Sequence, residues 1–211
     1  MAIIKSGATS DNMTVDPISK AARITLYDSA GRELSMQNKQ TFVVASTFTP
    51  AATPTDLVII EGSATKTIRI ISMKIWTTNT AAGSQSFQLI KRSTADTTGT
   101  FVSAGTPVAM DSNNAASTVS RVGHFTANPG ALGTAIGTMS NIRVASPAAI
   151  PATWAGITPD SGVEMLDWMD KSTLDQPIVL RGIAQCLAIN FNGAALVAGQ
   201  THSYRILWIE E

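Results

Sequence analysis

The stretch Thr65–Thr77, TKTIRIISMKIWT, is the longest β-type run in the chain, and it decides the fold class. It is rich in β-branched residues, contains neither Gly nor Pro, and alternates apolar with polar side chains. The apolar phase slips by one residue at the pair Ile70–Ile71. Because side chains alternate along a strand with period two, we expect a β-bulge or a bend at that pair. The alternative is a strand that is buried on both faces and has no bulge.

The rest of the chain supplies partners for this strand. From Asp56 onward, short apolar runs are separated by Gly, Asn, Asp, Ser and Pro at strand-and-turn spacing, with no amphipathic helix of ten or more residues. The expected strands are Leu57–Ile60, Thr65–Thr77, Ser86–Lys91, Pro107–Met110, Thr118–Thr126, Thr138–Ala145, Val163–Trp168, Ile178–Arg181, Gln185–Phe191 and Ser203–Ile209. This pattern predicts an all-β fold, an antiparallel β-sandwich with jelly-roll topology. An immunoglobulin-like sandwich is the alternative, but its Cys…Trp…Cys spacing is missing.

The N-terminal part has a different texture. Residues 1–19 contain apolar side chains that follow no helical or strand period, namely Ile3, Ile4, Met13, Val15 and Ile18. We expect an extended arm that uses these five residues to bind a partner and becomes ordered on binding. The alternative is a frayed terminus.

Two further strands are expected before the main body, at Ala21–Tyr27 and Thr41–Phe48. The second ends at Pro50 and Pro54, whose missing N–H groups suit a linker. The predicted organisation is therefore an arm with anchoring strands at 1–54 and a sandwich domain at 55–211.

Charge is scarce and balanced. Of 211 residues, 44% are hydrophobic and only 14% are charged, and the 15 basic residues match the 15 acidic ones. No net field would attract nucleic acid or an anionic membrane, so neither is an expected partner. A surface this neutral favours association, so we expect a homo-oligomer or a larger assembly. No apolar run reaches 18 residues and no signal peptide is evident, which predicts a soluble protein made in a cytoplasm.

No motif for catalysis or metal binding stands out. His124, His202 and Cys186 show no metal-ligand spacing, and Cys186 lies in an apolar run typical of a buried small hydrophobe. We therefore expect no catalytic residue, no cofactor and no metal.

One acidic cluster could carry chemistry. It consists of Asp160, Glu164, Asp167, Asp170 and Asp175. Paired carboxylates can hydrolyse glycosidic bonds, and the nearby Trp154 and Trp168 could stack on sugar rings. A solvated acidic rim with Trp168 in the core is the simpler interpretation.

Several motifs resemble those of tailed-bacteriophage virion proteins. In the N-terminal region they are Ile4-Lys-Ser-Gly7, Thr14-Val-Asp-Pro17, Ser19–Asp28 (SKAARITLYD) and Gly31-Arg32. Later segments, among them LVIIEGSATKTIRI, FTANPGALGTAIGT and LAINFNG, resemble the bodies of similar phage structural proteins. The resemblance covers most of the chain and carries no catalytic motif.

This resemblance implies a structural role in the virion. The expected function is a capsid decoration (cement) subunit that binds other virion proteins through its arm. A tail or head-fibre adaptor, or a glycan-binding module, is the alternative, and a glycan hydrolase is less favoured. Partners would be the major capsid protein or tail and neck proteins, and analogy with similar virion proteins suggests a trimer.

Overall fold

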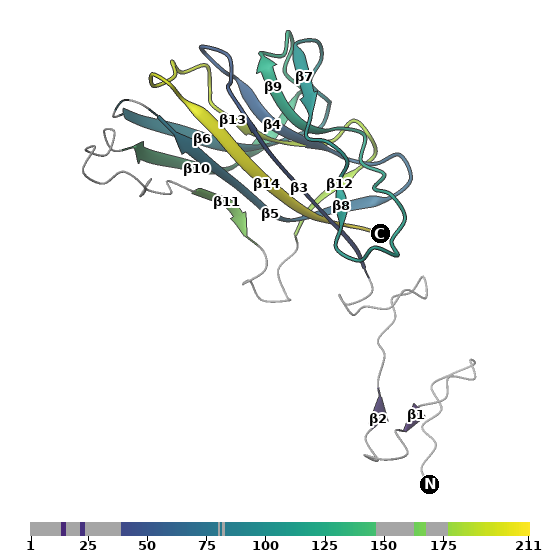
Figure 1. Cartoon of the computed structure of the whole chain (residues 1–211). Helices are drawn as coiled ribbons and strands as arrows, with labels where there is room; N and C mark the ends of the chain where they lie inside the picture. The colour runs from purple at the N-terminus through teal and green to yellow at the C-terminus, as the bar shows by residue number, and fades with distance from the viewer. Residues whose placement is uncertain are drawn as a thin grey trace, which may run out of the picture. The chain divides into compact units, whose positions relative to one another are not determined.

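The computed structural model describes residues 14–15, 22–23, 39–79, 81, 83–146, 163–167 and 177–211. Every regular element in these residues is a β-strand, and every strand pairing is antiparallel (Figure 1). The strands are β1 (Thr14–Val15), β2 (Ala22–Arg23), β3 (Gln40–Phe48), β4 (Asp56–Glu61), β5 (Thr67–Thr78), β6 (Gly83–Arg92), β7 (Thr100–Ser103), β8 (Val108–Ala109), β9 (Val122–Ala127), β10 (Ala135–Ser146), β11 (Val163–Asp167), β12 (Ile178–Arg181), β13 (Cys186–Asn190) and β14 (Thr201–Glu210).

Two sheets form the sandwich (Figure 1). The first, here called the β6 sheet, has the order β10-β6-β13-β4-β9-β7; the second, the β5 sheet, has the order β11-β5-β14-β3-β8, and β12 also pairs with β5. The pairing is nested, since β3 pairs with β14, β4 with β13, β5 with β11 and β12, and β6 with β10. Successive nested pairs fall in alternate sheets, as in a long hairpin rolled into a jelly roll. The predicted all-β jelly-roll sandwich is therefore confirmed.

Strands β7, β8 and β9 are an insertion between β6 and β10. Strand β9 pairs with β4, and β7 pairs with β9, so both widen the β6 sheet. Strand β8 adds to the β5 sheet by pairing with β3. Strand β7, which follows Gly99, has only four residues and is absent from the expected strands.

The predicted irregularity in β5 is a β-bulge. Strand β14 pairs Trp208 with Ile70 and Leu207 with Ser72, which leaves Ile71 without a partner residue. The extra residue restores the apolar phase. Four apolar residues from both sides of the bulge therefore lie in the main core, namely Ile68, Ile70, Met73 and Ile75. Ile71 lies in a separate small cluster with Leu207 and Ile209.

The space between the sheets is filled by apolar and aromatic side chains from both of them. Its largest fully buried members include Trp208, Tyr204, Phe42 and Phe87. Burial of an apolar side chain of this size stabilises the fold by about 1.5–3 kcal/mol, so this core is the main stabilising feature.

The boundary between the two parts of the chain differs from the expected one. The compact units are Met1–Lys39 and Gln40–Glu211, not 1–54 and 55–211. Strand β3 pairs with β14 along its whole length and so belongs to the sandwich. Pro50 and Pro54 lie in the connection that carries the chain from the β5 sheet to the β6 sheet, where a missing N–H costs no ladder bond.

The first unit contains one described element, the pair β1–β2. Thr14 pairs with Arg23 and Val15 pairs with Ala22. This pair includes part of the expected strand at 21–27; the rest of that strand lies outside the described residues.

Candidate functional site

The five arm residues that were expected to bind a partner fall almost entirely outside the described residues. Only the backbone of Val15 is described, in β1. Ile3, Ile4, Met13 and Ile18 lie outside that part of the chain. Their role therefore stays a prediction.

The acidic cluster is described only in part. The backbones of Glu164 and Asp167 lie in β11, opposite Lys74 and Ser72 of β5. The other members, Asp160, Asp170 and Asp175, and both nearby tryptophans, Trp154 and Trp168, lie outside the described residues. Glycan binding or hydrolysis at this stretch is untested.

Both histidines are buried inside the sandwich, whereas the cysteine faces its outside. The ring of His124 stacks on Phe48 at 4.2 Å between centroids, and its Nδ1 lies 3.1 Å from the hydroxyl of Tyr204. His202 is fully buried, and its Nδ1 lies 2.9 Å from the hydroxyl of Thr77. Burial lowers the pKa of both imidazoles, and that of His202 falls to about 4. Among the described residues no group of three His, Cys, Asp or Glu is arranged to hold a metal.

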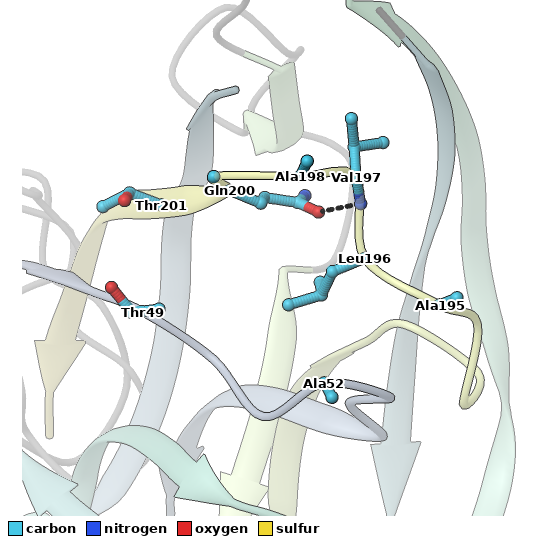
Figure 2. A pocket seen from close by; sticks show the side chains of 9 residues that line it. Thr49, Ala52, Ala195, Leu196, Val197, Ala198, Gln200 and Thr201 are labelled. Atoms are coloured by element: carbon cyan, nitrogen blue, oxygen red, sulfur yellow. Dashed lines mark hydrogen bonds between the residues drawn. The ribbon is translucent and has the colours of Figure 1, made fainter. Parts of the chain in front are cut away.

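Among the cavities that open on the surface of the described body, two are considered for a site. One, of about 440 Å³, lies between Thr49, Ala52 and the loop 195–201 (Figure 2). None of its lining residues is ionisable, and the side-chain oxygen of Gln200 accepts the backbone N–H of Val197 at 3.1 Å. The other, of about 210 Å³, contains Arg121, which is already bound to Glu61 and lies over the ring of Phe101. Neither cavity presents a free acid or base for catalysis.

The edge strand β10 carries exposed apolar side chains. Its register with β6 shifts twice, and the two residues skipped by the pairing are Ile136 and Met139. Their side chains are 59% and 51% exposed, and Leu132, just before the strand, is 42% exposed. Bulges turn side chains out of the regular alternation, which is why these two project from the sheet. We call Leu132, Ile136 and Met139 the β10 edge surface.

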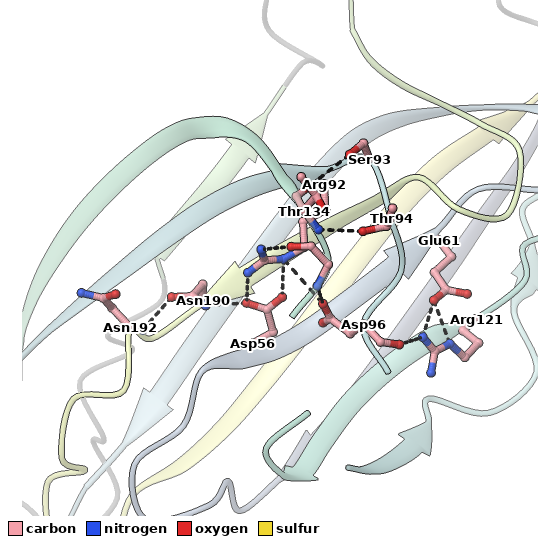
Figure 3. A network of polar contacts seen from close by, with 11 residues as sticks. Asp56, Glu61, Arg92, Ser93, Thr94, Asp96, Arg121, Thr134, Asn190 and Asn192 are labelled. Atoms are coloured by element: carbon pink, nitrogen blue, oxygen red, sulfur yellow. Dashed lines mark hydrogen bonds and ion pairs between the residues drawn. The ribbon is translucent and has the colours of Figure 1, made fainter. Parts of the chain in front are cut away.

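A buried polar network lies on the outer face of the β6 sheet (Figure 3). Arg92 of β6 donates from Nε and Nη2 to the two carboxylate oxygens of Asp56 at 2.7 and 2.8 Å, and Asn190 of β13 also donates to Asp56. Arg92 Nη1 donates to the carbonyl of Gly133 at 2.7 Å. Its Nε lies 3.6 Å from Asp96. All these side chains are buried.

Two loop segments, residues 93–99 and 128–134, lie side by side and contribute to this network; we call them the straps. Backbone bonds join them, including Thr97 N–H to the carbonyl of Ala131 at 2.9 Å. Gly133 N–H donates to the Asp96 carboxylate at 2.8 Å. A Cβ at Gly133 would lie 1.8 Å from the carbonyl oxygen of Thr94, so only glycine allows this close approach.

Comparison with known proteins adds no assignment. The chain matches no protein-family model, and neither a curated protein sequence nor a solved structure matches it. No helix in the described residues is long and apolar enough to cross a membrane.

Neither the β10 edge surface nor the polar network is predicted by the sequence. The edge surface depends on two bulges in a run that reads as an ordinary strand. The network joins Asp56, Arg92, Asp96 and Asn190, which lie far apart in the sequence and carry no shared motif. The pairing of β4, β13 and β6 brings them together.

Proposed function

We propose that this protein is a non-enzymatic structural component of a tailed-bacteriophage virion. It is a capsid decoration subunit, made in the cytoplasm of the host bacterium, that attaches to other virion proteins through its N-terminal arm. The observation from the structure that carries the proposal is the β10 edge surface on a nearly charge-free edge strand, since it offers a second contact, by apolar burial, in addition to the arm. The sequence resemblance of residues 4–32 to phage virion proteins supports the same assignment.

The chemistry of the body suits attachment without charge steering. Strand β10 contains one charged residue, Arg143, and the whole chain carries equal numbers of acidic and basic residues. Burial of Ile136 and Met139 against a neighbour would contribute about 1.5–3 kcal/mol for each fully buried side chain. Such binding depends little on salt, which suits a subunit that must stay on a particle after release.

The jelly roll is compatible with this role but does not establish it. Jelly rolls occur in viral capsid and lectin domains and in cupins, so the fold alone assigns no function. The two cavities described above contain no free ionisable group, so neither of them offers an acid–base site.

The test is a count of this chain in intact, purified particles by quantitative mass spectrometry. Hundreds of copies per particle are expected for a decoration subunit. A few to a few dozen copies would reassign the protein to the tail or neck. Absence from particles would contradict the proposal altogether.

A further inference from the structure

The straps are held over the outer face of the β6 sheet by a cluster with an unbalanced charge. The carboxyl groups of Asp56 and Asp96 are both fully buried, and one nearly buried guanidinium, that of Arg92, faces them. Arg92 makes two short hydrogen bonds to Asp56, whereas its contact with Asp96 is a longer ion pair of 3.6 Å. If both carboxyls were ionised, one negative charge would stay uncompensated in a site that excludes water.

Other charged groups around this cluster do not correct the imbalance. Arg121 faces Glu61, to which it is hydrogen-bonded, and donates only to the backbone carbonyl of Asp96. The thiol of Cys186 on β13 is neutral, since burial raises its pKa. Asn190 contributes only an uncharged amide. The excess charge therefore belongs to the Asp56–Asp96 pair.

One oxygen of this pair lacks a donor. Asp96 Oδ1 accepts the N–H of Gly133 at 2.8 Å, but Asp96 Oδ2 has no hydrogen-bond partner within the described part of the chain. A proton on Oδ2 would remove the excess charge and let Asp96 donate toward Asp56. Burial, together with the neighbouring Asp56, raises the pKa of Asp96 to about 7, although the bond from Gly133 and the charge of Arg92 oppose this shift.

We propose that a proton on Asp96 acts as a latch that holds the two straps closed over the outer face of the β6 sheet. With the proton in place, the carboxyl bridges the straps to the Asp56–Arg92 pair. Without it, the buried charge favours opening, which returns the carboxylate to water. This conformational device does not depend on the proposed attachment of the protein to particles, although the second strap includes Leu132 of the β10 edge surface.

The direction of the pH effect follows from the two pKa values. In the open state Asp96 has an ordinary pKa of 3.8, and in the closed state about 7. Between these values the closed state binds one more proton than the open state. The opening equilibrium therefore rises about tenfold per pH unit from about pH 4 to 7 and levels off above that range.

Cys186 reports the opening. It is the only cysteine in the chain and is fully buried. It pairs directly with Glu61 and Arg92, so its side chain lies on the same face of the sheet as theirs, where the straps contact Arg92. Opening of the straps exposes this thiol to a small reagent.

The experiment measures the reaction of Cys186 with 4,4′-dithiodipyridine in the full chain between pH 4.5 and 8.5. Dividing each rate by the rate for the urea-unfolded protein at the same pH removes the effect of thiol ionisation. The normalised rate is expected to rise about tenfold per pH unit up to pH 6.5 and to become flat above about pH 7.5.

Two variants separate the latch from other causes. Asp96→Asn keeps an oxygen for Gly133 and a donor toward Asp56, so its normalised rate is expected to stay constant with pH. Asp111→Asn, at an exposed turn, is the matched control and should behave like the wild type. A flat wild-type profile, or a rise that persists in Asp96→Asn, would overturn the proposal.

A direct titration keeps the proposal testable if Asp96→Asn does not fold. In wild-type protein labelled with ¹³C at its carboxyl groups, one aspartate carboxyl carbon is expected to titrate near pH 7. Global unfolding does not mimic the labelling result, because the protons that the two buried histidines gain on unfolding offset the proton that Asp96 loses as pH rises to 6.5. If every aspartate carboxyl titrates below pH 5.5, the latch does not exist.

Discussion

At the scale of single residues, His202 makes the stability of the sandwich depend on pH. Three aromatic rings surround its imidazole, those of Phe48, Phe87 and Phe191. Its Nε2 has no hydrogen-bond partner among the described residues. A protonated ring would thus carry a buried charge without a counter-ion, which is the reason for its low pKa.

We expect His202→Leu to remove part of the acid sensitivity of folding. The pKa of His202 is about 4 when folded and 6.5 when unfolded, so the unfolded state binds an extra proton between those values. Relative to the variant, the wild type should lose about 1.4 kcal/mol of unfolding free energy per pH unit as pH falls from 6.5 to 4. Urea unfolding of both proteins at several pH values measures this difference. Asp96 makes an opposite contribution to the pH dependence of the unfolding free energy, but it is present in both proteins and cancels in the comparison. If the unfolding free energy changes equally with pH in both proteins, His202 is not the source of the acid sensitivity.

Arg92 is the other residue whose loss should be costly. Its removal leaves Asp56 buried without its partner, and breaking a buried pair in this way typically costs about 3–5 kcal/mol. We therefore expect Arg92→Met to lower the unfolding free energy by an amount in that range at pH 7. Arg205→Met, at an exposed position on β14, is the control and should change it by less than about 0.5 kcal/mol. Equal effects in the two variants would show that the network adds no stability.

At the scale of elements, the bulge in β5 explains how a strand whose apolar phase slips by one residue still places its apolar side chains in the core. Deleting Ile71 removes the residue that has no partner on β14 and leaves Ile70 and Met73 facing inward. We expect this deletion to fold, with a lower melting temperature because a small outer cluster loses Ile71. Deleting Leu89 from the regularly paired part of β6 should prevent folding, since it reverses the faces of the residues that follow. Thermal unfolding of each purified deletion variant, or the lack of soluble protein, distinguishes the two outcomes. If neither variant folds, the bulge does not tolerate the loss of a residue.

The sequence predicted the strands where apolar periodicity was strong. Each of the ten expected runs from 57 to 209 overlaps an observed strand, and the phase slip in 65–77 located the bulge. Periodicity failed where tertiary pairing decides the outcome. Strand β7 forms because β9 lies beside it, and β3 joins the sandwich because β14 pairs with it, despite the prolines that suggested a linker.

The candidate sites were harder to predict for a related physical reason. The alternation of apolar and polar residues in β10 is weak, so its bulges give no clear phase slip in the sequence. The exposure of Ile136 and Met139 could therefore not be predicted. Asp96 lies in a loop, where acidic side chains are usually solvated. Only the approach of the second strap, through Gly133, buries it.

At the scale of the whole molecule, the body and the arm have separate sources of order. The unit Gln40–Glu211 contains both sheets of the sandwich and all of the main core that the structure describes. The arm residues 2–19 contain five apolar anchors that would give about 1.5–3 kcal/mol each if buried, against about 1–2 kcal/mol per residue for ordering the backbone. Five anchors do not offset the ordering of eighteen residues unless a partner also supplies backbone hydrogen bonds, as strand addition does.

Deleting residues 2–19 should therefore separate folding from attachment. The truncated protein is expected to keep the melting temperature of the full chain within about 2 °C, because all the core residues that the structure describes lie in Gln40–Glu211 and are kept. Its binding to particles should be abolished or strongly weakened, because the anchors that a neighbour would bury are gone. A pull-down with virions that lack this protein, using full-length chain as the control, measures the binding. If the truncated chain binds as well as the full-length one, attachment does not depend on the arm, and the β10 edge surface becomes the place to look for it.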